Sequence, residues 1–208
     1  MRIAAVILAG GRGRRMGGAI KANIVVGGRP LLQRVTEALG QTPSPIIVAH
    51  GATPAADLGM SSAHLAVPDL AVPYGGPLVG LAAAVAHCSG LREPPDALVS
   101  VAVDTPLMPA DFVERLAAAL RSDYPAVIAR YAGQDYPTNA IWRLAAIRDL
   151  PLALAAGSAP RSLRGLAAGL GATFLDWPLS PGGDPFVNVN TPADLATLEA
   201  RLAGPAGA

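Results

Sequence analysis

Cysteine, aromatic residues and charge are all scarce in this sequence. Cys88 is the single cysteine, which excludes an internal disulfide framework and a four-cysteine zinc site and favours a reducing compartment. Aromatic residues make up 4% of the chain and charged residues 15%, and the net charge is +1. This balance gives no overall attraction to nucleic acid or to an anionic membrane surface. We therefore expect neither as a partner.

Long apolar runs are also missing. No stretch reaches the roughly 18 uninterrupted apolar residues of a membrane span. The first apolar run, residues 3–8, is shorter than the apolar region of a signal peptide and leads into glycines, so we expect a cytoplasmic protein. Hydrophobic residues make up 51% of the 208 residues, enough for a substantial core. We expect one domain over residues 1–203 and a frayed tail at 204–208.

The opening of the chain joins an apolar segment to a basic, glycine-rich one. Residues 3–8 (IAAVIL) predict a buried parallel strand, which breaks into AGGRGRRMGG at residues 9–18. Glycines let backbone N–H groups approach a ligand, and three arginines with Lys21 add positive charge. This pattern favours a phosphate-binding loop over the alternative, a basic surface loop. The residue order is neither that of a P-loop nor that of a dinucleotide-binding fingerprint.

Strands and helices are expected to alternate through the first half of the chain. Apolar runs predict strands at residues 3–8, 46–49, 63–67 and 97–103. Helical periodicity predicts helices at residues 30–39, at 77–87 and from 109 onward. Short βα connections of this kind are typical of a parallel sheet with helices on both faces.

The second half departs from this alternation. Residues 126–131 and 136–142 flank a glycine-containing segment and predict an antiparallel hairpin. The remaining expected elements are helices at residues 144–155 and 161–168, strands at 173–175 and 186–189, and a last helix from 191 or 192 to 202. The predicted fold is a single-domain, Rossmann-like α/β fold with a mostly parallel twisted sheet and an antiparallel hairpin excursion.

Several polar residues follow the expected strands directly. Ligands of open α/β sheets collect outside the carboxyl ends of the strands, which brings the 10–15 loop, Asp69, the 75–77 loop and Asp104 around one crevice. A carboxylate at the end of an apolar strand is costly unless a cation or hydrogen bonds satisfy it. Magnesium, which binds one or two carboxylates together with substrate phosphates, suits Asp104. The alternative is that Asp104 only caps the following turn.

Other polar residues carry weaker signals. Asn188 and Asn190 stand two apart on an expected strand, so both would face either metal or substrate, unless they only form the turn before the last helix. Cys88 and the histidines His50, His64 and His87 lack catalytic partners at recognisable spacing, and we interpret all four as structural.

Several motifs, in order and over nearly the whole chain, resemble those of one family. The first is Leu8-Ala9-Gly10-Gly11, continued by Arg15-Met16-Gly17-Gly18 and Lys21. The later ones are Gly27-Gly28-Arg29-Pro30-Leu31, Gly76-Pro77-Leu78 with Gly80, Val103-Asp104-Thr105-Pro106, Tyr136-Pro137-Thr138, and Phe186-Val187-Asn188-Val189-Asn190-Thr191-Pro192. Together they resemble the molybdenum cofactor guanylyltransferases of the nucleotidyltransferase superfamily.

This resemblance implies a magnesium-dependent transfer of GMP from GTP to molybdopterin, with release of pyrophosphate. A phosphate oxygen of the acceptor would attack the α-phosphorus in line, a reaction that depends on positioning and charge neutralisation more than on protein acids or bases. The implied catalytic residues are Arg15, Lys21 and Asp104, with Asp104 also holding Mg2+. The implied nucleotide-binding residues are Leu8, Ala9, Gly10, Gly11, Arg12, Gly13, Lys21, Asp69, Gly76, Pro77, Asp104, Asn188 and Asn190.

The resemblance also places molybdopterin near residues 136–139 and near Arg161 and Arg164, and it implies molybdenum-insertion proteins and molybdoenzyme chaperones as further partners. Two positions depart from the family pattern: Ile20 stands where a polar Asp or Asn is usual, and Ala49 where an asparagine is usual. The alternatives are therefore cytidylyl transfer to molybdopterin, nucleotidyl transfer to a sugar phosphate, and an inactive homologue that only binds nucleotide or cofactor.

Overall fold

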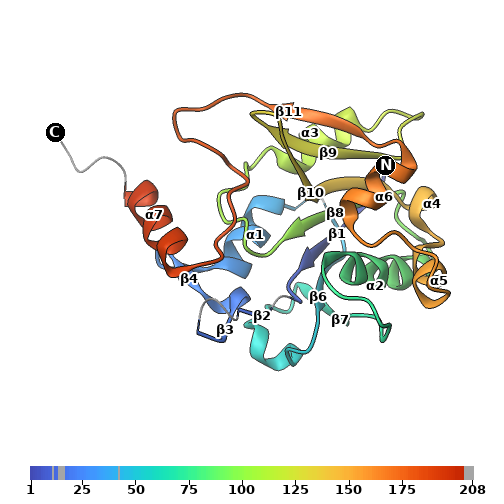
Figure 1. The fold of residues 1–208 in the computed structure, drawn as a ribbon, viewed down its shortest axis with the longest axis horizontal. Coiled ribbons are helices and arrows are strands. Elements are labelled where there is room, and N and C mark those ends of the chain that lie inside the picture. The colour runs from blue at the N-terminus through green and yellow to red at the C-terminus, as the bar shows by residue number, and fades with distance from the viewer. Residues whose placement is uncertain (11, 14–16, 42, 204–208) are drawn as a thin grey trace.

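A seven-stranded sheet organises the molecule, with the strand order β11-β9-β10-β8-β1-β6-β7 (Figure 1). The computed structural model describes residues 1–10, 12–13, 17–41 and 43–203. The strands are β1 (Ile3–Leu8), β6 (Ile46–His50), β7 (His64–Pro68), β8 (Ala97–Ala102), β9 (Ala126–Tyr131), β10 (Gln134–Arg143) and β11 (Thr173–Trp177). Neighbours pair in parallel except at β10, which is antiparallel to both β8 and β9. The carboxyl ends of all these strands but β10 therefore meet at one edge.

The central strands β1 and β8 are buried along their whole length. Successive side chains of a strand point to opposite faces, so alternate residues enter two separate cores. Ile3, Ala5 and Ile7 pack into one core, whereas Ala4 and Val6 pack into the other. Burial on both faces explains why β1 is a continuous apolar run in the sequence and why Ser100 alone interrupts the apolar run of β8.

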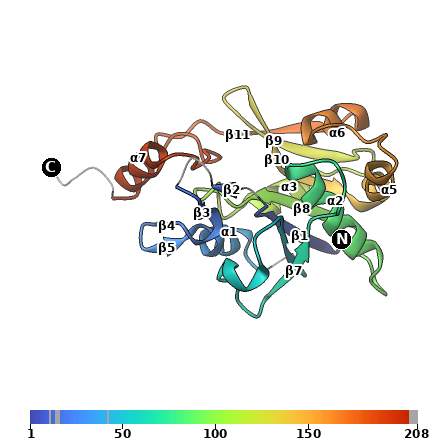
Figure 2. The same ribbon diagram turned by 60° about the horizontal axis from the view of Figure 1, so that its bottom comes forward.

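Helices cover both faces of the sheet (Figures 1 and 2). One core contains side chains of α1 (Leu31–Leu39) and α3 (Phe112–Ala119). The other contains side chains of α2 (Pro77–Ser89), α4 (Leu144–Ile147), α5 (Leu150–Ala155) and α6 (Leu163–Leu170). The sequence predicted these helices, but it predicted a single helix over 144–155. Pro151 stands in the first turn of α5, where its missing N–H is tolerated, so the chain starts a new helix there.

The last helix, α7 (Pro192–Ala203), lies at one end of the molecule (Figure 2). Leu198 joins Val26, Leu31 and Val189 in a small third core. Val26 belongs to β4 (Val25–Val26), which pairs with β5 (Arg29–Pro30) in a short hairpin. The remaining described elements are two 3-10 helices, η2 (Lys21–Asn23) and η3 (Ala55–Leu58), and a short antiparallel pair of strands, β2 (Arg12–Gly13) and β3 (Ala19–Ile20). Within the described residues, no helix has the length and apolar character needed to cross a membrane.

One predicted helix start and one predicted strand were wrong. The helix expected from residue 109 begins at Phe112, after a turn in which the Phe112 N–H donates to the Pro109 carbonyl. Residues 186–189 do not form a strand. This segment crosses the end of β8, where the Val189 N–H donates to the carbonyl of Asp104, and Phe186 is anchored among aromatic rings of other elements. The tail expected at 204–208 lies outside the described residues.

The predicted hairpin is confirmed, with a tighter turn and an interruption. Residues 132–133 alone connect β9 to β10, and both have positive φ (48° and 79°), as the two-residue turns of twisted hairpins require. Further along, Tyr136 pairs with Ala129 but Ala140 pairs with Ile128. Residues 137–139 therefore bulge out of the ladder, and bulges commonly re-aim side chains next to functional sites.

A buried polar pair joins β8 to β10, and we expect its loss to destabilise the fold. The Trp142 indole N–H donates to Ser100 Oγ at 2.9 Å, and both residues are fully buried. Ser100→Ala leaves the indole N–H without a partner, which we expect to lower the free energy of unfolding by about 1–3 kcal/mol in urea titrations. The exposed Ser62→Ala is the control, with an expected change below about 0.5 kcal/mol. An equally small change in Ser100→Ala would contradict the prediction.

Candidate functional site

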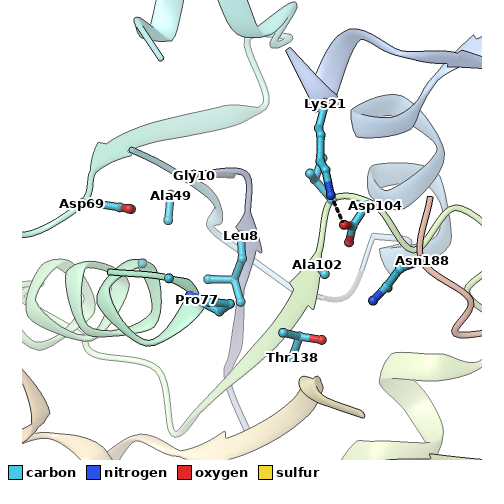
Figure 3. A pocket seen from close by; sticks show the side chains of 13 residues that line it. Leu8, Gly10, Lys21, Ala49, Asp69, Pro77, Ala102, Asp104, Thr138 and Asn188 are labelled. Atoms are coloured by element: carbon cyan, nitrogen blue, oxygen red, sulfur yellow. Dashed lines mark hydrogen bonds and ion pairs between the residues drawn. The ribbon is translucent and has the colours of Figure 1, made fainter. Parts of the chain in front are cut away.

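A cavity of about 280 Å3 opens at the carboxyl edge of the sheet. Its walls come from segments far apart in the sequence: the ends of β1, β6 and β8, the start of α2, the β10 bulge and the segment before α7 (Figure 3). The lining residues are Leu8, Gly10, Lys21, Ala49, Asp69, Gly76, Pro77, Gly80, Ala102, Val103, Asp104, Thr138 and Asn188. The topology predicted this position, because the strand ends meet there.

A lysine and a carboxylate face each other on one side of the cavity. Lys21 Nζ lies 2.6 Å from Asp104 Oδ2, and each side chain retains about one-seventh of its exposure (14% and 13%). Lys21 also donates to Asn190 Oδ1 at 2.6 Å. Asp104 therefore has a cation beside it, as its position after an apolar strand demands, and in this structure the cation is Lys21. The two residues are 83 positions apart in the sequence.

The asparagine segment is fixed against the same end of β8. Thr105 Oγ1 donates to Asn188 Oδ1 at 3.3 Å, and the Val189 backbone N–H donates to the Asp104 carbonyl at 2.9 Å. Asn188 lines the cavity directly, whereas Asn190 reaches it through Lys21. Both asparagines thus lie beside Asp104, although the strand from which this was predicted does not form.

A second carboxylate, Asp69, lies on the other side of the cavity, past Leu8 and Ala49 (Figure 3). Its Oδ1 atom is buried and has no hydrogen-bond partner in the described structure. Burial raises the pKa of Asp69, and the nearby His50 opposes this rise only in part. A buried carboxylate oxygen without a partner is unusual in a folded protein and marks a position where a ligand donor would be accommodated.

Two glycines make room for Asp69. A Cβ atom at Gly10 would lie 2.8 Å from Asp69 Oδ2, and one at Gly80 would lie 3.3 Å from Asp69 Oδ1 and 3.0 Å from Leu8 Cδ2. Any side chain at these positions would fill the cavity floor or displace the carboxylate. Gly10 was predicted as a site residue, and Gly80 was quoted only as part of a motif.

Most of the predicted nucleotide-binding residues meet at the cavity. Leu8, Gly10, Lys21, Asp69, Gly76, Pro77, Asp104 and Asn188 line it. Ala9 is buried and does not line the cavity, and its N–H donates to the carbonyl of Ala49, a cavity-lining residue. Arg12 and Gly13 form β2, a short strand paired with β3 (Ala19–Ile20). Gly11 and Arg15 lie outside the described residues.

The predicted acceptor residues separate into two groups. Thr138 lines the cavity. Arg164 is exposed, and its Nη1 atom lies 3.6 Å from Asp135 Oδ2. Neither Arg164 nor Arg161 is among the cavity-lining residues. Asn139, which was expected near the acceptor, is fully buried and accepts the Ala102 N–H through its Oδ1, and it is not among the cavity-lining residues. Thr105 was missed as a site residue, because its role depends on a hydrogen bond to a distant segment.

None of the described cavity-lining residues is the cysteine or a histidine. Cys88 is fully buried in α2, and burial raises the pKa of its thiol to about 11, so it remains an unreactive thiol. His50 Nδ1 is bonded to the Thr53 carbonyl, and His64 Nε2 to the Thr36 hydroxyl.

A mostly parallel sheet with a ligand-sized cavity at its carboxyl edge is the architecture of an open α/β protein that binds its ligand at the strand ends. Two solved structures share this fold. Molybdopterin-guanine dinucleotide biosynthesis protein A from Archaeoglobus fulgidus is 23% identical, with a TM-score of 0.70, and the match covers 96% of this chain and 97% of that one. CMP:2-keto-3-deoxy-manno-octonic acid synthetase, complexed with CTP, is 17% identical, with a TM-score of 0.72 over 98% and 99% of the two chains.

Sequence comparison identifies the family. Residues 5–174 match the MobA-like NTP transferase domain. The molybdenum cofactor guanylyltransferase of Rhodobacter capsulatus is 39% identical over 97% of both chains, and that of Cereibacter sphaeroides is 37% identical over 97% of this chain and 98% of the relative. The chain belongs to the molybdenum cofactor guanylyltransferase family, which confirms the resemblance seen in its motifs.

Proposed function

We propose that this protein transfers GMP from GTP to molybdopterin and releases pyrophosphate, in the cytoplasm. The observation that carries the proposal is the pairing of Lys21 with Asp104 opposite the unpaired Asp69 in one cavity. One end has the charges that a triphosphate and its metal need, and the other has an acceptor for the donors of a base. The names of the relatives support guanine and molybdopterin as the two substrates.

At the phosphate end, Lys21 exchanges partners when GTP binds. In the free protein its ammonium group contacts Asp104 and Asn190. A triphosphate offers stronger anionic acceptors, and Lys21 then contacts the β- and γ-phosphates while the basic 10–15 segment supplies further positive charge. Arg15 has its proposed catalytic role in this segment, as a stabiliser of the charge on the leaving pyrophosphate.

The donors at this end suit Mg2+. Within the described residues no cluster of three or more histidines, cysteines or carboxylates could hold a metal by itself. Asp104 provides one carboxylate and Asn188 an amide oxygen nearby, and a hard ion that takes most of its ligands from phosphates and water needs little more. When bound, Mg2+ neutralises charge on the phosphates.

At the base end, Asp69 accepts hydrogen bonds from guanine. Guanine presents two neighbouring donors, N1–H and the 2-amino group, whereas adenine and cytosine present an acceptor at the corresponding ring nitrogen. A carboxylate attracts the first pattern and repels the others. Gly10 and Gly80 carry no side chain that would displace this carboxylate from the cavity wall. The small side chain of Ala49 at the cavity wall leaves further room for a bicyclic base.

The acceptor is proposed to enter past Thr138 and Asn188, with its phosphate directed at the α-phosphate of GTP. The cavity contains no cysteine or histidine among its described residues, which agrees with a direct displacement that needs no protein nucleophile. The protein's contribution is to align the two phosphates and to balance their charge.

Pyrophosphate release tests the proposal. The protein is incubated with GTP, CTP or ATP and with molybdopterin or a sugar 1-phosphate, in the presence of Mg2+. We expect release only with GTP and molybdopterin. Turnover of CTP or of a sugar 1-phosphate, with none of GTP plus molybdopterin, would identify another transferase. Binding of GTP in calorimetry without any pyrophosphate release would identify an inactive homologue.

Asp194 is expected to affect GTP use through Asn190. Its Oδ2 accepts the backbone N–H groups of Asn190 and Thr191, and Thr191 Oγ1 accepts the Asp194 N–H in return. Asp194→Ala frees the segment that carries Asn190, so we expect KM for GTP to rise about 2- to 10-fold. Thr191→Ala is the matched control, because it removes the helix cap but keeps the contact between Asp194 and Asn190. Equal KM values in the two variants would show that only the helix cap matters.

A further inference from the structure

The connection between β11 and α7, residues 178–191, carries Asn188 and Asn190 but contains no helix or strand (Figure 1). Without a ladder of backbone hydrogen bonds, such a segment is held in place by individual contacts. At its C-terminal end the carboxylate of Asp194 accepts the Asn190 N–H. On the N-terminal side of the asparagines, a second aspartate, Asp184, has the corresponding position.

Asp184 joins three parts of the molecule. Its Oδ2 accepts the hydroxyl of Tyr136 in β10, and its Oδ1 accepts the N–H of Phe186 at 2.8 Å, which closes an Asx turn. The Asp184 carbonyl accepts the guanidinium of Arg201 in α7 at 3.3 Å. Burial and the neighbouring Asp184 carboxylate raise the pKa of Tyr136, so its hydroxyl remains a donor at neutral pH.

The Asx turn of Asp184 fixes the backbone just before Asn188. Phe186, at the end of the turn, is fully buried against aromatic rings of three other elements, with the centroids 5.0, 5.2 and 5.9 Å away. Asn188 follows two residues later and lines the cavity, where its Oδ1 accepts the Thr105 hydroxyl at 3.3 Å (Figure 3). A displacement of the backbone at Phe186 therefore reaches Asn188 within two residues.

The space behind Asn188 increases the importance of these contacts. A cavity of about 90 Å3 lies between residues 187–189 and α7, where Thr197, Leu198 and Arg201 line it. Unfilled space of this kind deprives the segment of packing contacts on one side. The polar contacts at either end therefore contribute more to the position of Asn188 than they would against a filled interior.

We propose that Asp184 is a positioning residue for the transfer reaction, which holds the backbone of residues 184–188 so that the amide of Asn188 is presented beside Asp104. This inference rests on the proposed function. Asp184 is not among the residues that line the cavity, so it acts on the substrate only through Asn188. Its loss should then have little further effect once the Asn188 amide is removed.

A double-variant cycle tests this dependence. We expect Asp184→Ala to lower kcat/KM for GTP about 10-fold in the wild-type background and less than about twofold in the Asn188→Ala background. Asp184→Asn keeps an oxygen for the Phe186 N–H and offers an amide N–H to the Tyr136 hydroxyl, so it should retain kcat/KM within about threefold of the wild type. Asp176→Ala, which removes an exposed carboxylate in β11, is the matched control and should keep full activity.

Two results of the cycle would overturn the proposal. A loss of equal size in both backgrounds would show that Asp184 only supports the fold, and wild-type activity of Asn188→Ala would leave Asp184 no residue to position. If Asp184→Ala does not fold, Tyr136→Phe replaces it in the cycle, because it removes one donor to the carboxylate and keeps the ring. Its loss should be about 3- to 5-fold and should also disappear in Asn188→Ala.

Failure of the proposed function gives a different result, since the wild-type protein would then release no pyrophosphate from GTP and molybdopterin. The same cycle is then measured as the Kd of GTP in calorimetry with Mg2+. We expect Asp184→Ala to weaken GTP binding about 10-fold in the wild-type background and less than about twofold in Asn188→Ala. Equal weakening in both backgrounds, or none in either, would overturn the positioning role independently of turnover.

Discussion

Asp104→Asn is expected to lower kcat for pyrophosphate release by roughly 1000-fold, because several kcal/mol of transition-state charge stabilisation depends on this carboxylate. In the proposed reaction Asp104, near the end of β8, would hold Mg2+ beside the phosphates, and an amide oxygen is a much weaker ligand. We expect the variant still to bind GTP through Asp69 and the basic 10–15 segment. The substitution should therefore lower kcat much more than it lowers the affinity for GTP measured by calorimetry.

A structural role for the ion pair must be separated from this effect. Asp104→Asn also removes the charged partner of Lys21, and Lys21→Met leaves the Asp104 carboxylate without its cation. We expect the double variant to recover thermal stability while remaining inactive, since the two residues act on one triphosphate. Asp111→Asn, an exposed carboxylate in the connection after β8, is the matched control and should keep full activity. Recovery of turnover in the double variant would show that the pair only supports the fold.

The sequence predicted the central part of the molecule well because its signals there are local. β1 is apolar at every position and β8 at every position except Ser100, a pattern that indicates burial on both faces, and Asp104 stands two residues after the end of β8. Once the strands are parallel, the rule that their carboxyl ends meet brings Gly10, Asp69 and Asp104 together without further information. These residues could therefore be assigned to one site from the pattern alone.

The asparagine segment shows where local pattern fails. Residues 186–190 read FVNVN, and this alternation is the period of a strand. A strand also needs a neighbouring strand, and here the chain crosses the end of β8, where the Val189 N–H donates a backbone hydrogen bond to the Asp104 carbonyl but no ladder forms within the described residues. Whether a neighbouring edge is available is decided by the rest of the fold, so the sequence of the segment could not show it.

The β10 bulge could not be predicted from the sequence for a similar reason. Residues 136–142 read as an uninterrupted strand, and the interruption depends on the register that β9 and β8 impose from either side. Pro137 was the available signal, because proline cannot donate to a ladder and within sheets is confined to edges, strand starts and bulges. The hydrogen bond between Asn139 and Ala102 follows from that register, and it could only be found in three dimensions.

Asp69→Asn is expected to weaken the use of GTP and to raise the thermal stability of the free protein. Loss of the carboxylate removes charge-assisted hydrogen bonds to guanine, so kcat/KM for GTP falls about 10- to 100-fold. The fall in kcat/KM should be smaller for ITP, which lacks the 2-amino group. The variant should therefore prefer GTP over ITP less strongly than the wild type does. A preference equal to that of the wild type would contradict the assignment of Asp69 to the base.

The stability of the free protein gives an independent test of the same residue. Burial raises the pKa of Asp69 in the folded state above its ordinary value of 3.8. As pH rises from the ordinary pKa to the raised pKa of the folded state, Asp69 loses its proton first in the unfolded chain. The charged carboxylate therefore makes folding less favourable at neutral pH. Asp69→Asn removes this cost, and we expect a higher thermal midpoint than the wild type at pH 7, with the difference disappearing below the ordinary pKa. A variant that is less stable than the wild type at pH 7 would show that the Asp69 carboxylate has stabilising partners in the ligand-free protein. It would contradict the view that this carboxylate lacks a partner until a ligand binds.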